Sequence, residues 1–380
     1  MIPFNKPHLT GKETHYIYDA VNSGQLSGNG KYTRMCQEWM EHKFGFGKCL
    51  LTTSCTDALE MAAILLNIKE GDEVIMPSYT FVSTANAFVL RGAKIVFADS
   101  KPNHPGMDES KIEDLITSKT KAIVPVHYAG VACDMDLIME VAQKHKLFVV
   151  EDAAQAIDSY FINKRGEKKA LGTIGHLAAF SFHETKNIIS GEGGMLAIND
   201  AQFYDRAEII WEKGTNRSAF FKGEVDKYGW VDVGSSFLPS EMVAAFLFAQ
   251  LESLEGIQAR RTQIWYTYQN KLAHWCRSNN IKLPRVPEYA TNNAHMFYLV
   301  CESKKQRSQL IQYLKDHDVL SVFHYLSLHK SEFYQNKHDG RALMECDRYA
   351  DTLVRLPLYF DLLEEEQNLI VKAINSFSFE

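Results

Sequence analysis

The chain has 380 residues, of which 46% are hydrophobic and 23% are charged, and its formal net charge is −6. This length and composition are typical of a globular protein with a large buried core. No run of like charges reaches five residues, which argues against binding to polynucleotides or acidic membranes. We find neither a signal-peptide pattern nor about 18 uninterrupted apolar residues, so we expect no membrane span and a cytoplasmic protein.

The seven cysteines are scattered along the chain and include no C-x-x-C pair. This arrangement predicts neither a disulfide framework nor a zinc site and fits a reducing compartment. The histidines of the last third of the chain also lack a repeated metal-ligand spacing. We therefore expect no metal site.

Between about residues 47 and 200, short apolar runs alternate with amphipathic stretches, which is the pattern of a doubly wound α/β domain. Helices are expected over Thr56–Leu66 and Met135–His145, where apolar residues recur with helical spacing. Several of the expected strands are almost continuously hydrophobic, as buried parallel strands are. The seven strands are expected at Cys49–Thr52, Glu73–Met76, Lys94–Phe97, Ala122–Val126, Leu147–Glu151, Ala178–Phe182 and Met195–Asn199.

After about residue 240 the pattern predicts a second, smaller α+β domain. We place the boundary between a large domain with an N-terminal arm, residues 1–254, and a C-terminal domain, residues 255–380. No Pro/Ser-rich linker separates the two, so we expect them to pack closely. The expected elements are helices over Glu241–Gln263, Lys304–Asp316 and Glu364–Phe377 and strands over Asn293–Cys301 and Val319–His324.

Two residues at strand ends suggest chemistry. Asp152 follows the strand Leu147–Glu151, and Lys186 follows the strand Ala178–Phe182 and precedes a glycine-rich turn. Ligands of open α/β sheets bind at the carboxyl ends of strands. A lysine can form a Schiff base with the aldehyde of pyridoxal 5′-phosphate, and a carboxylate can pair with the ring nitrogen of that cofactor. Taken singly, Lys186 is more typical of a solvated surface group and Asp152 of a helix N-cap.

A hydroxyl-rich turn, Thr53–Asp57, follows the first strand and opens the first of these helices. Backbone N–H groups and the positive end of the helix dipole make such a turn a site for a phosphate. Ser54 and Thr56 are equally typical of plain N-capping residues. Ser181 is a candidate for a second phosphate donor.

Other polar and aromatic residues could complete a site around a flat cofactor ring. Phe81 follows another strand and could stack on the ring, although such an aromatic residue also fits the core. Gln155, one helical turn beyond the aspartate, could donate to the ring hydroxyl or lie exposed. His295, His324 and His329 could face a substrate, although surface or core positions are the commoner fate of such histidines.

Taken together, these motifs resemble the DegT/DnrJ/StrS family of pyridoxal-phosphate-dependent sugar aminotransferases, over nearly the whole chain. The resemblance implies a fold type I enzyme, with a large, mostly parallel sheet domain and a smaller C-terminal domain. It also implies a homodimer with shared active sites. The segments that carry it are Gly24–Gly30, Ser54–Thr56, Met76–Phe81, Pro125–Gly130, Glu151–Gln155, Ser181–Asn187 and Gly191–Gly194.

The resemblance implies a reaction that moves an amino group from L-glutamate to C4 of a dTDP-4-keto-6-deoxyhexose. Lys186 would be the Schiff-base lysine and Asp152 the partner of the pyridinium. The cofactor-binding set would be Lys186, Asp152, Gln155, Phe81, Ser54, Cys55, Thr56, Ser181, His183 and Ser236. Substrate contacts would come from Asn216, Arg217, His295, His324 and His329.

The chain departs from the family pattern in three places. Ser236 stands where many relatives carry an asparagine that reaches the phosphate in the other subunit. Ser327 stands where a proline is usual, and the loop Asn163–Lys169 is longer and more basic than is typical. These differences could alter the cross-subunit contact and the choice of sugar.

Within the family, the stretches Met1–Asn5, Ser83–Arg91 and Glu212–Ser218 most resemble enzymes that form dTDP-4-amino-4,6-dideoxygalactose. Amination at C3, or the opposite configuration at C4, stays open from sequence. A non-catalytic regulatory homologue is a further alternative. The presence of Lys186 argues against it and against related dehydratases, which usually have histidine at this position.

Overall fold

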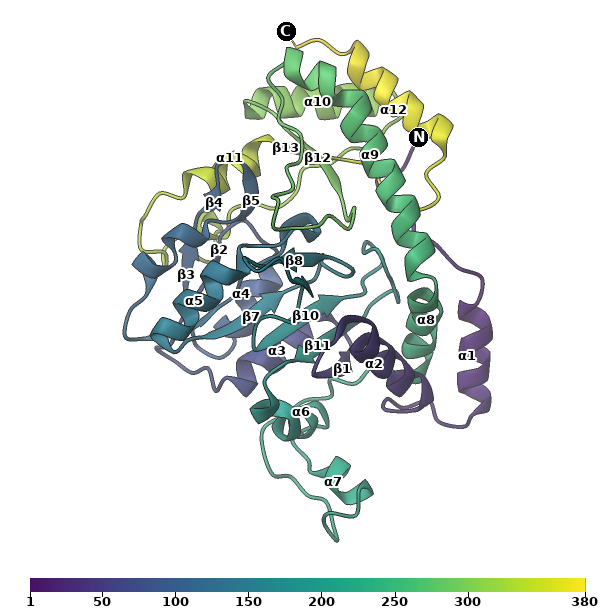
Figure 1. Cartoon of the computed structure of the whole chain (residues 1–380), viewed down its shortest axis with the longest axis vertical. Coiled ribbons are helices and arrows are strands. Elements are labelled where there is room, and N and C mark those ends of the chain that lie inside the picture. Colours follow the sequence, from purple (N-terminus) through teal and green to yellow (C-terminus); the bar gives the residue numbers. More distant parts are fainter. Residues whose placement is uncertain (380) are drawn as a thin grey trace.

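A seven-stranded sheet in the order β1-β11-β10-β7-β6-β2-β3 forms the centre of the computed structural model, which describes residues 1–379 (Figure 1). Strands β10, β7, β6, β2 and β3 run parallel, whereas β11 is antiparallel to both β10 and β1. The strands are β1 (Lys48–Thr52), β2 (Glu73–Pro77), β3 (Lys94–Ala98), β6 (Thr120–Ile123), β7 (Phe148–Asp152), β10 (Leu177–Ser181) and β11 (Gly194–Ile198). The α/β class and the seven expected strands are therefore confirmed.

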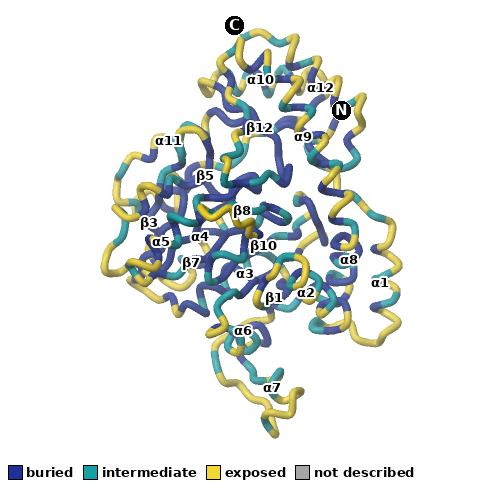
Figure 2. The backbone as a smooth tube through the Cα atoms, viewed as in Figure 1, coloured by how far each residue is buried: buried dark blue, intermediate teal, exposed yellow. Residues whose placement is uncertain are grey.

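Two hydrophobic clusters cover the two faces of this sheet, and Figure 2 shows that the central strands are mostly buried. Successive residues of a strand point to opposite faces. Accordingly, Val149 belongs to the cluster with α2, α5 and α8, and Val150 belongs to the cluster with α3, α4 and α6. The helices are α2 (Lys31–Phe44), α3 (Cys55–Leu65), α4 (Val82–Val89), α5 (Met135–His145), α6 (Tyr204–Trp211) and α8 (Glu241–Glu252).

The C-terminal part has a small antiparallel sheet of two strands, β12 and β13, and a hydrophobic cluster of its own. Ile264, Phe297, Leu310 and Ile370 are fully buried there. The smaller α+β unit is thus confirmed, and the boundary at residue 254/255 stays a prediction. Its elements are α9 (Leu254–Ser278), β12 (Phe297–Val300), α10 (Lys304–Asp316), α11 (Met344–Thr352), β13 (Leu353–Leu356) and α12 (Glu364–Ser376).

Two sequence-based expectations were wrong. The helix expected over Glu241–Gln263 is two helices, because Ser253 leaves the helical conformation (φ −100°, ψ 6°) between α8 and α9. This break lets α8 pack on the large sheet while α9 packs in the C-terminal cluster. The expected strand Val319–His324 forms only isolated bridges, since Val319 pairs with Ile2 and Val322 pairs with Arg355.

The remaining elements lie at the periphery of the sheet. Helix α1 packs against α8, and the loop that was expected to be long is the tip of the hairpin β8–β9. Helix α7 lies on a segment that projects from the body of the molecule, at the bottom of Figure 1. These elements are α1 (Glu13–Asn22), β4 (Ser100–Lys101), β5 (His104–Met107), β8 (Tyr160–Ile162), β9 (Lys168–Ala170) and α7 (Arg217–Phe221). Of the described helices, none combines the length and apolar character needed to cross a membrane.

Candidate active site

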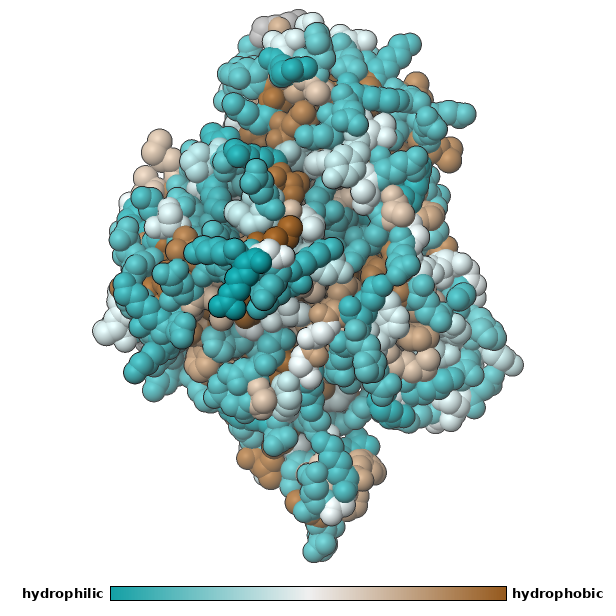
Figure 3. All heavy atoms as spheres, viewed as in Figure 1, coloured by the Kyte–Doolittle hydropathy of each residue, from teal (hydrophilic) through white to brown (hydrophobic). Residues whose placement is uncertain are grey.

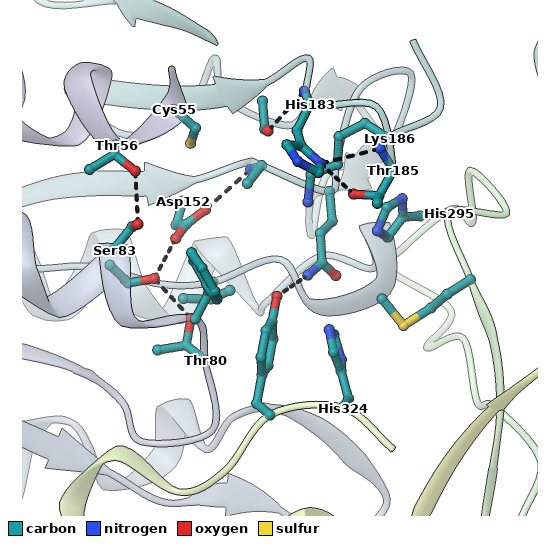
Figure 4. A pocket seen from close by; sticks show the side chains of 18 of the residues that line it. Cys55, Thr56, Thr80, Ser83, Asp152, His183, Thr185, Lys186, His295 and His324 are labelled. Carbon is teal, nitrogen blue, oxygen red and sulfur yellow. Dashed lines mark hydrogen bonds between the residues drawn. The ribbon is translucent and has the colours of Figure 1, made fainter. Parts of the chain in front are cut away.

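A cavity of about 590 Å³ lies at the carboxyl edge of the parallel strands and reaches the small sheet. Most of the residues singled out in the sequence line it, although they come from six separate parts of the chain (Figure 4). This location is the one expected for ligand binding in an open α/β sheet. The predicted residues in its lining are Ser54, Cys55, Thr56, Phe81, Asp152, Gln155, Ser181, His183, Lys186, His295 and His324.

Asp152 ends strand β7 and is buried. The Thr84 hydroxyl donates to its Oδ2 (2.7 Å), and the Ala154 N–H donates to its Oδ1 (3.2 Å). Burial raises the pKa of Asp152, against the opposing effects of these two hydrogen bonds and of the nearby Lys186. In residues 1–379 no cation forms an ion pair with Asp152, and a buried carboxylate without one is costly. The position therefore suits a cationic ligand atom.

Lys186 lies in the turn that follows strand β10, and its backbone N–H donates to the carbonyl of His183 (2.8 Å). Desolvation lowers the pKa of Lys186, and the positive charge of Arg355 lowers it further. Cys55 and Asp152 act in the opposite direction. A lowered pKa leaves more of the lysine as the free amine that attacks an aldehyde.

The turn at the start of α3 forms a cradle for an anion. Ser54 caps this helix, since its Oγ accepts from the Asp57 N–H (3.1 Å). The Thr56 hydroxyl donates to Ser83 Oγ (2.8 Å). Gly194, at the start of β11, packs so tightly that a Cβ there would lie 2.3 Å from the carbonyl carbon of Ser54 and 2.4 Å from the Cys55 nitrogen. The free N–H groups of the first helical turn and its dipole favour a phosphate.

Gln155 has its amide orientation determined by two neighbours. Its Oε1 accepts from the Ala129 N–H (2.6 Å), and its Nε2 donates to the Tyr325 hydroxyl (2.8 Å). The ring of Tyr325 stacks on His324, with centroids 3.6 Å apart. Phe81 stands at the start of α4 and is 56% exposed although it lines the cavity. An aromatic side chain in that position is available to stack on a flat ligand.

His295 is a neutral imidazole with a defined tautomer. The Asn187 side-chain nitrogen donates to Gln258 Oε1 and to the Asn293 carbonyl (both 2.8 Å), so its oxygen accepts from His295 Nδ1 (2.9 Å). Burial, followed by the charge of Lys186, holds the pKa of His295 well below its usual value. With its proton on Nδ1, the ring has an unprotonated Nε2 available as an acceptor in the cavity wall.

His324 and His183 complete the histidines of the lining. His324 Nδ1 pairs with the Tyr128 hydroxyl (2.7 Å), and burial likewise holds the pKa of His324 well below its usual value. His183 Nδ1 accepts from the Thr185 N–H (3.3 Å). Figure 4 places His295 and His324 on the side of the cavity away from Cys55 and Thr56.

Four predicted residues do not line the cavity of their own chain. His329 is buried against Ser78, whose Oγ lies 2.8 Å from His329 Nδ1, because the chain turns at Leu328–Lys330. The substrate contact expected of His329 is therefore not formed within this chain. Of the other three, Asn216 and Arg217 lie at the start of α7 on the projecting segment, and Ser236 pairs with Glu212 where that segment joins the body of the molecule.

Several lining residues were missed by the sequence reasoning. Phe4 and Asn5 reach the cavity because the N-terminal segment pairs with Val319. Thr84, which donates to the buried carboxylate, lies in the stretch Ser83–Arg91 that carries the resemblance, but no site role was predicted for it. Arg355 is a lone charge in the apolar run Leu353–Leu356, and this was a signal that could have identified it.

A mostly parallel sheet with a desolvated lysine and a buried aspartate at its carboxyl edge is the arrangement expected of a fold type I enzyme. The model of the DegT/DnrJ/EryC1/StrS aminotransferase family matches residues 7–375. The chain therefore belongs to this family and is a pyridoxal-phosphate-dependent sugar aminotransferase, as expected from its motifs.

Individual relatives agree with this assignment. The chain is 32% identical to the spore coat polysaccharide biosynthesis protein SpsC of Bacillus subtilis (strain 168), over 98% of this chain and 96% of that protein. The aminotransferase from Psychrobacter cryohalolentis superimposes with a TM-score of 0.91 at 27% identity, covering 98% of each chain. The putative sugar aminotransferase Spr1654 from Streptococcus pneumoniae, in its PMP form, gives a TM-score of 0.90 at 25% identity, covering 99% of this chain and 98% of that one.

The residues present fit this cofactor. The carboxylate of Asp152 lacks a cationic partner within the described chain, as the site of a protonated ring nitrogen requires. The Ser54–Thr56 turn can lie directly against strand β11 only because residue 194 is a glycine, and the first helical turn that follows offers N–H groups to a phosphate. Lys186, whose pKa is lowered, stands in the same cavity.

Proposed function

We propose that this enzyme transfers the amino group of L-glutamate to C4 of a dTDP-4-keto-6-deoxyhexose and forms dTDP-4-amino-4,6-dideoxygalactose. The observation that carries the reaction type is the presence of Lys186 and Asp152 in one cavity. The sequence resemblance supports the choice of sugar, and two of its stretches reach the cavity, through Phe4 and Ser83. The name of the relative SpsC supports a role in making a surface polysaccharide.

Lys186 and Asp152 have different roles in this proposed reaction. Pyridoxal 5′-phosphate, when bound, supplies an aldehyde that carries the amino group and a ring that withdraws electrons. The Nζ of Lys186 takes the proton from Cα of glutamate and, in the second half of the reaction, delivers a proton to C4 of the sugar. Asp152, whose carboxylate accepts from Thr84 and Ala154, would keep the ring nitrogen of the bound cofactor protonated. Overall, amine and carbonyl oxygen are exchanged, giving one 2-oxoglutarate for each amino sugar.

We further propose a homodimer in which residues 213–236 of one subunit complete the cavity of the other. This segment exposes large apolar side chains, with Phe221 70%, Tyr228 53% and Trp230 84% exposed. Figure 3 shows hydrophobic side chains on this projection, at the bottom of the view. Exposed apolar groups gathered in one place are typical of an interaction surface. The segment also carries Asn216, Arg217 and Ser236, for which the site of the same chain offers no place.

The substrate is tested by incubating the purified protein with dTDP-4-keto-6-deoxyglucose and L-glutamate and determining the product by NMR. We expect an axial amine at C4 and equal amounts of 2-oxoglutarate. An equatorial amine would indicate the gluco product, and no reaction of a cofactor-loaded protein would favour a regulatory homologue. Amination at C3 is tested in the same way with the corresponding 3-keto sugar.

The dimer is tested by sedimentation and by mixing two inactive variants. Lys186→Ala lacks the lysine, and a variant with residues 216–231 shortened to a glycine linker lacks the projection. Because a shared site needs the lysine from one subunit and the projection from the other, the mixed dimer should regain activity. A monomeric wild type, or a mixture without activity, would contradict the shared site.

A further inference from the structure

Arg355 is a cation in the active-site wall that has no anionic partner. It stands on strand β13 of the small sheet and lines the cavity. Its Nε and Nη2 donate only to the carbonyl of Phe323, at 3.4 and 3.3 Å, and its guanidinium packs 4.6 Å from the centre of the Phe4 ring. In residues 1–379, no carboxylate pairs with it. Most of its five N–H groups therefore remain available to a ligand.

The neighbours of Arg355 leave its charge uncompensated. His295 and His324 are neutral, since their pKa values lie well below the usual value, and the tyrosines that face Arg355 have raised pKa values. The acids of the cavity lining are Asp152, which is suited to the ring nitrogen, and Glu192, which is largely exposed beside His183. Burial lowers the pKa of Arg355, but a guanidinium remains charged at neutral pH.

The position of the reacting amine indicates which anion this wall can accept. Arg355 and Lys186 line the same cavity, and the charge of Arg355 lowers the pKa of Lys186. The carbon that loses its proton must meet Lys186 Nζ, and in an amino acid the α-carboxylate is one bond from that carbon. In a nucleotide sugar, the diphosphate is separated from C4 by the sugar ring.

We infer that Arg355 binds the α-carboxylate of the amino donor and orients its Cα toward Lys186. This inference rests on the proposed function for the choice of L-glutamate as donor. A guanidinium matches a carboxylate with two parallel N–H···O bonds, which adds orientation to attraction. When the keto sugar replaces the donor, Arg355 has no carboxylate to bind, so the two halves of the reaction should depend on it unequally.

The test measures the two halves separately with Arg355→Met. In the first, enzyme loaded with pyridoxal 5′-phosphate reacts with L-glutamate, and 2-oxoglutarate is measured. In the second, enzyme loaded with pyridoxamine 5′-phosphate reacts with dTDP-4-keto-6-deoxyglucose. We expect kcat/KM for glutamate to fall roughly 100-fold, as for a lost charge-assisted pair. The kcat/KM for the keto sugar in the second half should change less than about threefold. Calorimetric binding of 2-oxoglutarate to the pyridoxamine-loaded enzyme should weaken in parallel.

Two further variants separate charge from structure. Arg355→Lys keeps the charge but not the paired geometry, so it should recover part of the lost activity toward glutamate. Arg307→Met is the matched control, because the Arg307 guanidinium packs on the same Phe323 (5.8 Å from the ring centre) and does not line the cavity. We expect Arg307→Met to leave both halves unchanged. If the methionine variant is unfolded, Arg355→Gln replaces it.

Equal losses in both halves would overturn the inference, since they would show that Arg355 only supports the Phe323 segment. A loss confined to the sugar half would also overturn it, by assigning Arg355 to the diphosphate. Unchanged binding of 2-oxoglutarate would do the same. If glutamate reacts and depends on Arg355 while no dTDP-keto sugar is aminated, the proposed function fails and the inference stands.

Discussion

The cavity has two halves that are built in different ways. The half that we propose for the cofactor, called the cofactor half below, is formed by three neighbouring parts of one sheet edge: the end of β7, the turn after β10 and the start of α3. The substrate half is formed by segments far apart in the sequence, which contribute Phe4, His295, His324 and Arg355. The chemistry of the first half is therefore a property of strand ends, whereas that of the second depends on how the two parts of the chain pack.

Burial also shifts the pKa values of groups in the two halves in opposite directions. In the cofactor half, the pKa of Asp152 is raised, whereas in the substrate half the pKa of His295 is lowered. Desolvation is the main cause in both cases because it disfavours the charged form of either group. A bound pyridinium would reverse the effect on Asp152, but a neutral sugar would not reverse the effect on His295.

The largest effect is expected from Lys186→Ala, which removes the amine of the cofactor half. We expect the rate of transamination to fall roughly 10⁴-fold, because the proton at Cα then has no base. The protein should stay folded, as followed by circular dichroism, with Lys164→Ala on the exposed hairpin tip as the control. Borohydride reduction and peptide mapping should place the cofactor on residue 186 of the wild type. A label elsewhere would contradict the assignment of this half.

The next largest effect is expected from Asp152→Asn. An amide cannot stabilise a protonated ring nitrogen, so kcat should fall roughly 10²–10³-fold while the cofactor still binds. Thr84→Val, which removes only the hydrogen bond to Oδ2, should have a much smaller effect. The measurement is the steady-state rate at saturating substrates. An unchanged rate in the asparagine variant would mean that another group faces the ring nitrogen.

A smaller effect is expected from Gly194→Ala, which tests the cradle for the phosphate. The new Cβ would lie 2.3–2.4 Å from backbone atoms of Ser54 and Cys55, so the turn must move. We expect a loss of about 1–3 kcal/mol of stability in urea unfolding and weaker cofactor binding in a titration. Gly256→Ala, in helix α9 with nothing within 4 Å of the added Cβ, is the control and should be neutral or slightly stabilising.

The smallest effect is expected from His295→Asn, which tests the electrostatics of the substrate half. The folded-state pKa of His295 lies well below the unfolded value of about 6.5. Below that pH the unfolded chain takes up a proton at His295 that the folded chain does not. The contribution of His295 to stability is therefore fully present above about pH 6.5 and is lost as the pH falls. Asparagine can keep the hydrogen bond to Asn187 without titrating.

Urea unfolding of the variant and of the wild type at about pH 7.5 and about pH 5.5 measures this difference. On acidification, the free energy of unfolding of the wild type should fall by about 1.4 kcal/mol more than that of the variant. Equal losses would show that His295 is charged in the folded protein. The pH dependence of stability that Asp152 contributes has the opposite sign, because its pKa is raised in the folded protein. The stability that it contributes at low pH is lost as the pH rises through the folded-state pKa.

The residues proposed for the cofactor half could be picked out from the sequence because they follow strands whose apolar runs are easy to recognise. Asp152 and Lys186 were found as polar residues just beyond such runs, and both line the cavity. The substrate half was predicted only in part. His295 and His324 line the cavity, whereas His329, five residues after His324, faces Ser78 instead, because a turn at Leu328–Lys330 intervenes.

By itself, the sequence determined the seven strands, the strand-end lysine and aspartate, and the family of the enzyme. Each of these follows from local properties: hydrophobic periodicity, turn residues and short motifs. Only the tertiary structure decided that Arg355 and the N-terminal Phe4 meet in the wall opposite the cofactor half, with two neutral histidines beside them. The physical reason is that contacts between distant segments, and the desolvation they cause, depend on packing in three dimensions and leave no periodic trace in the chain.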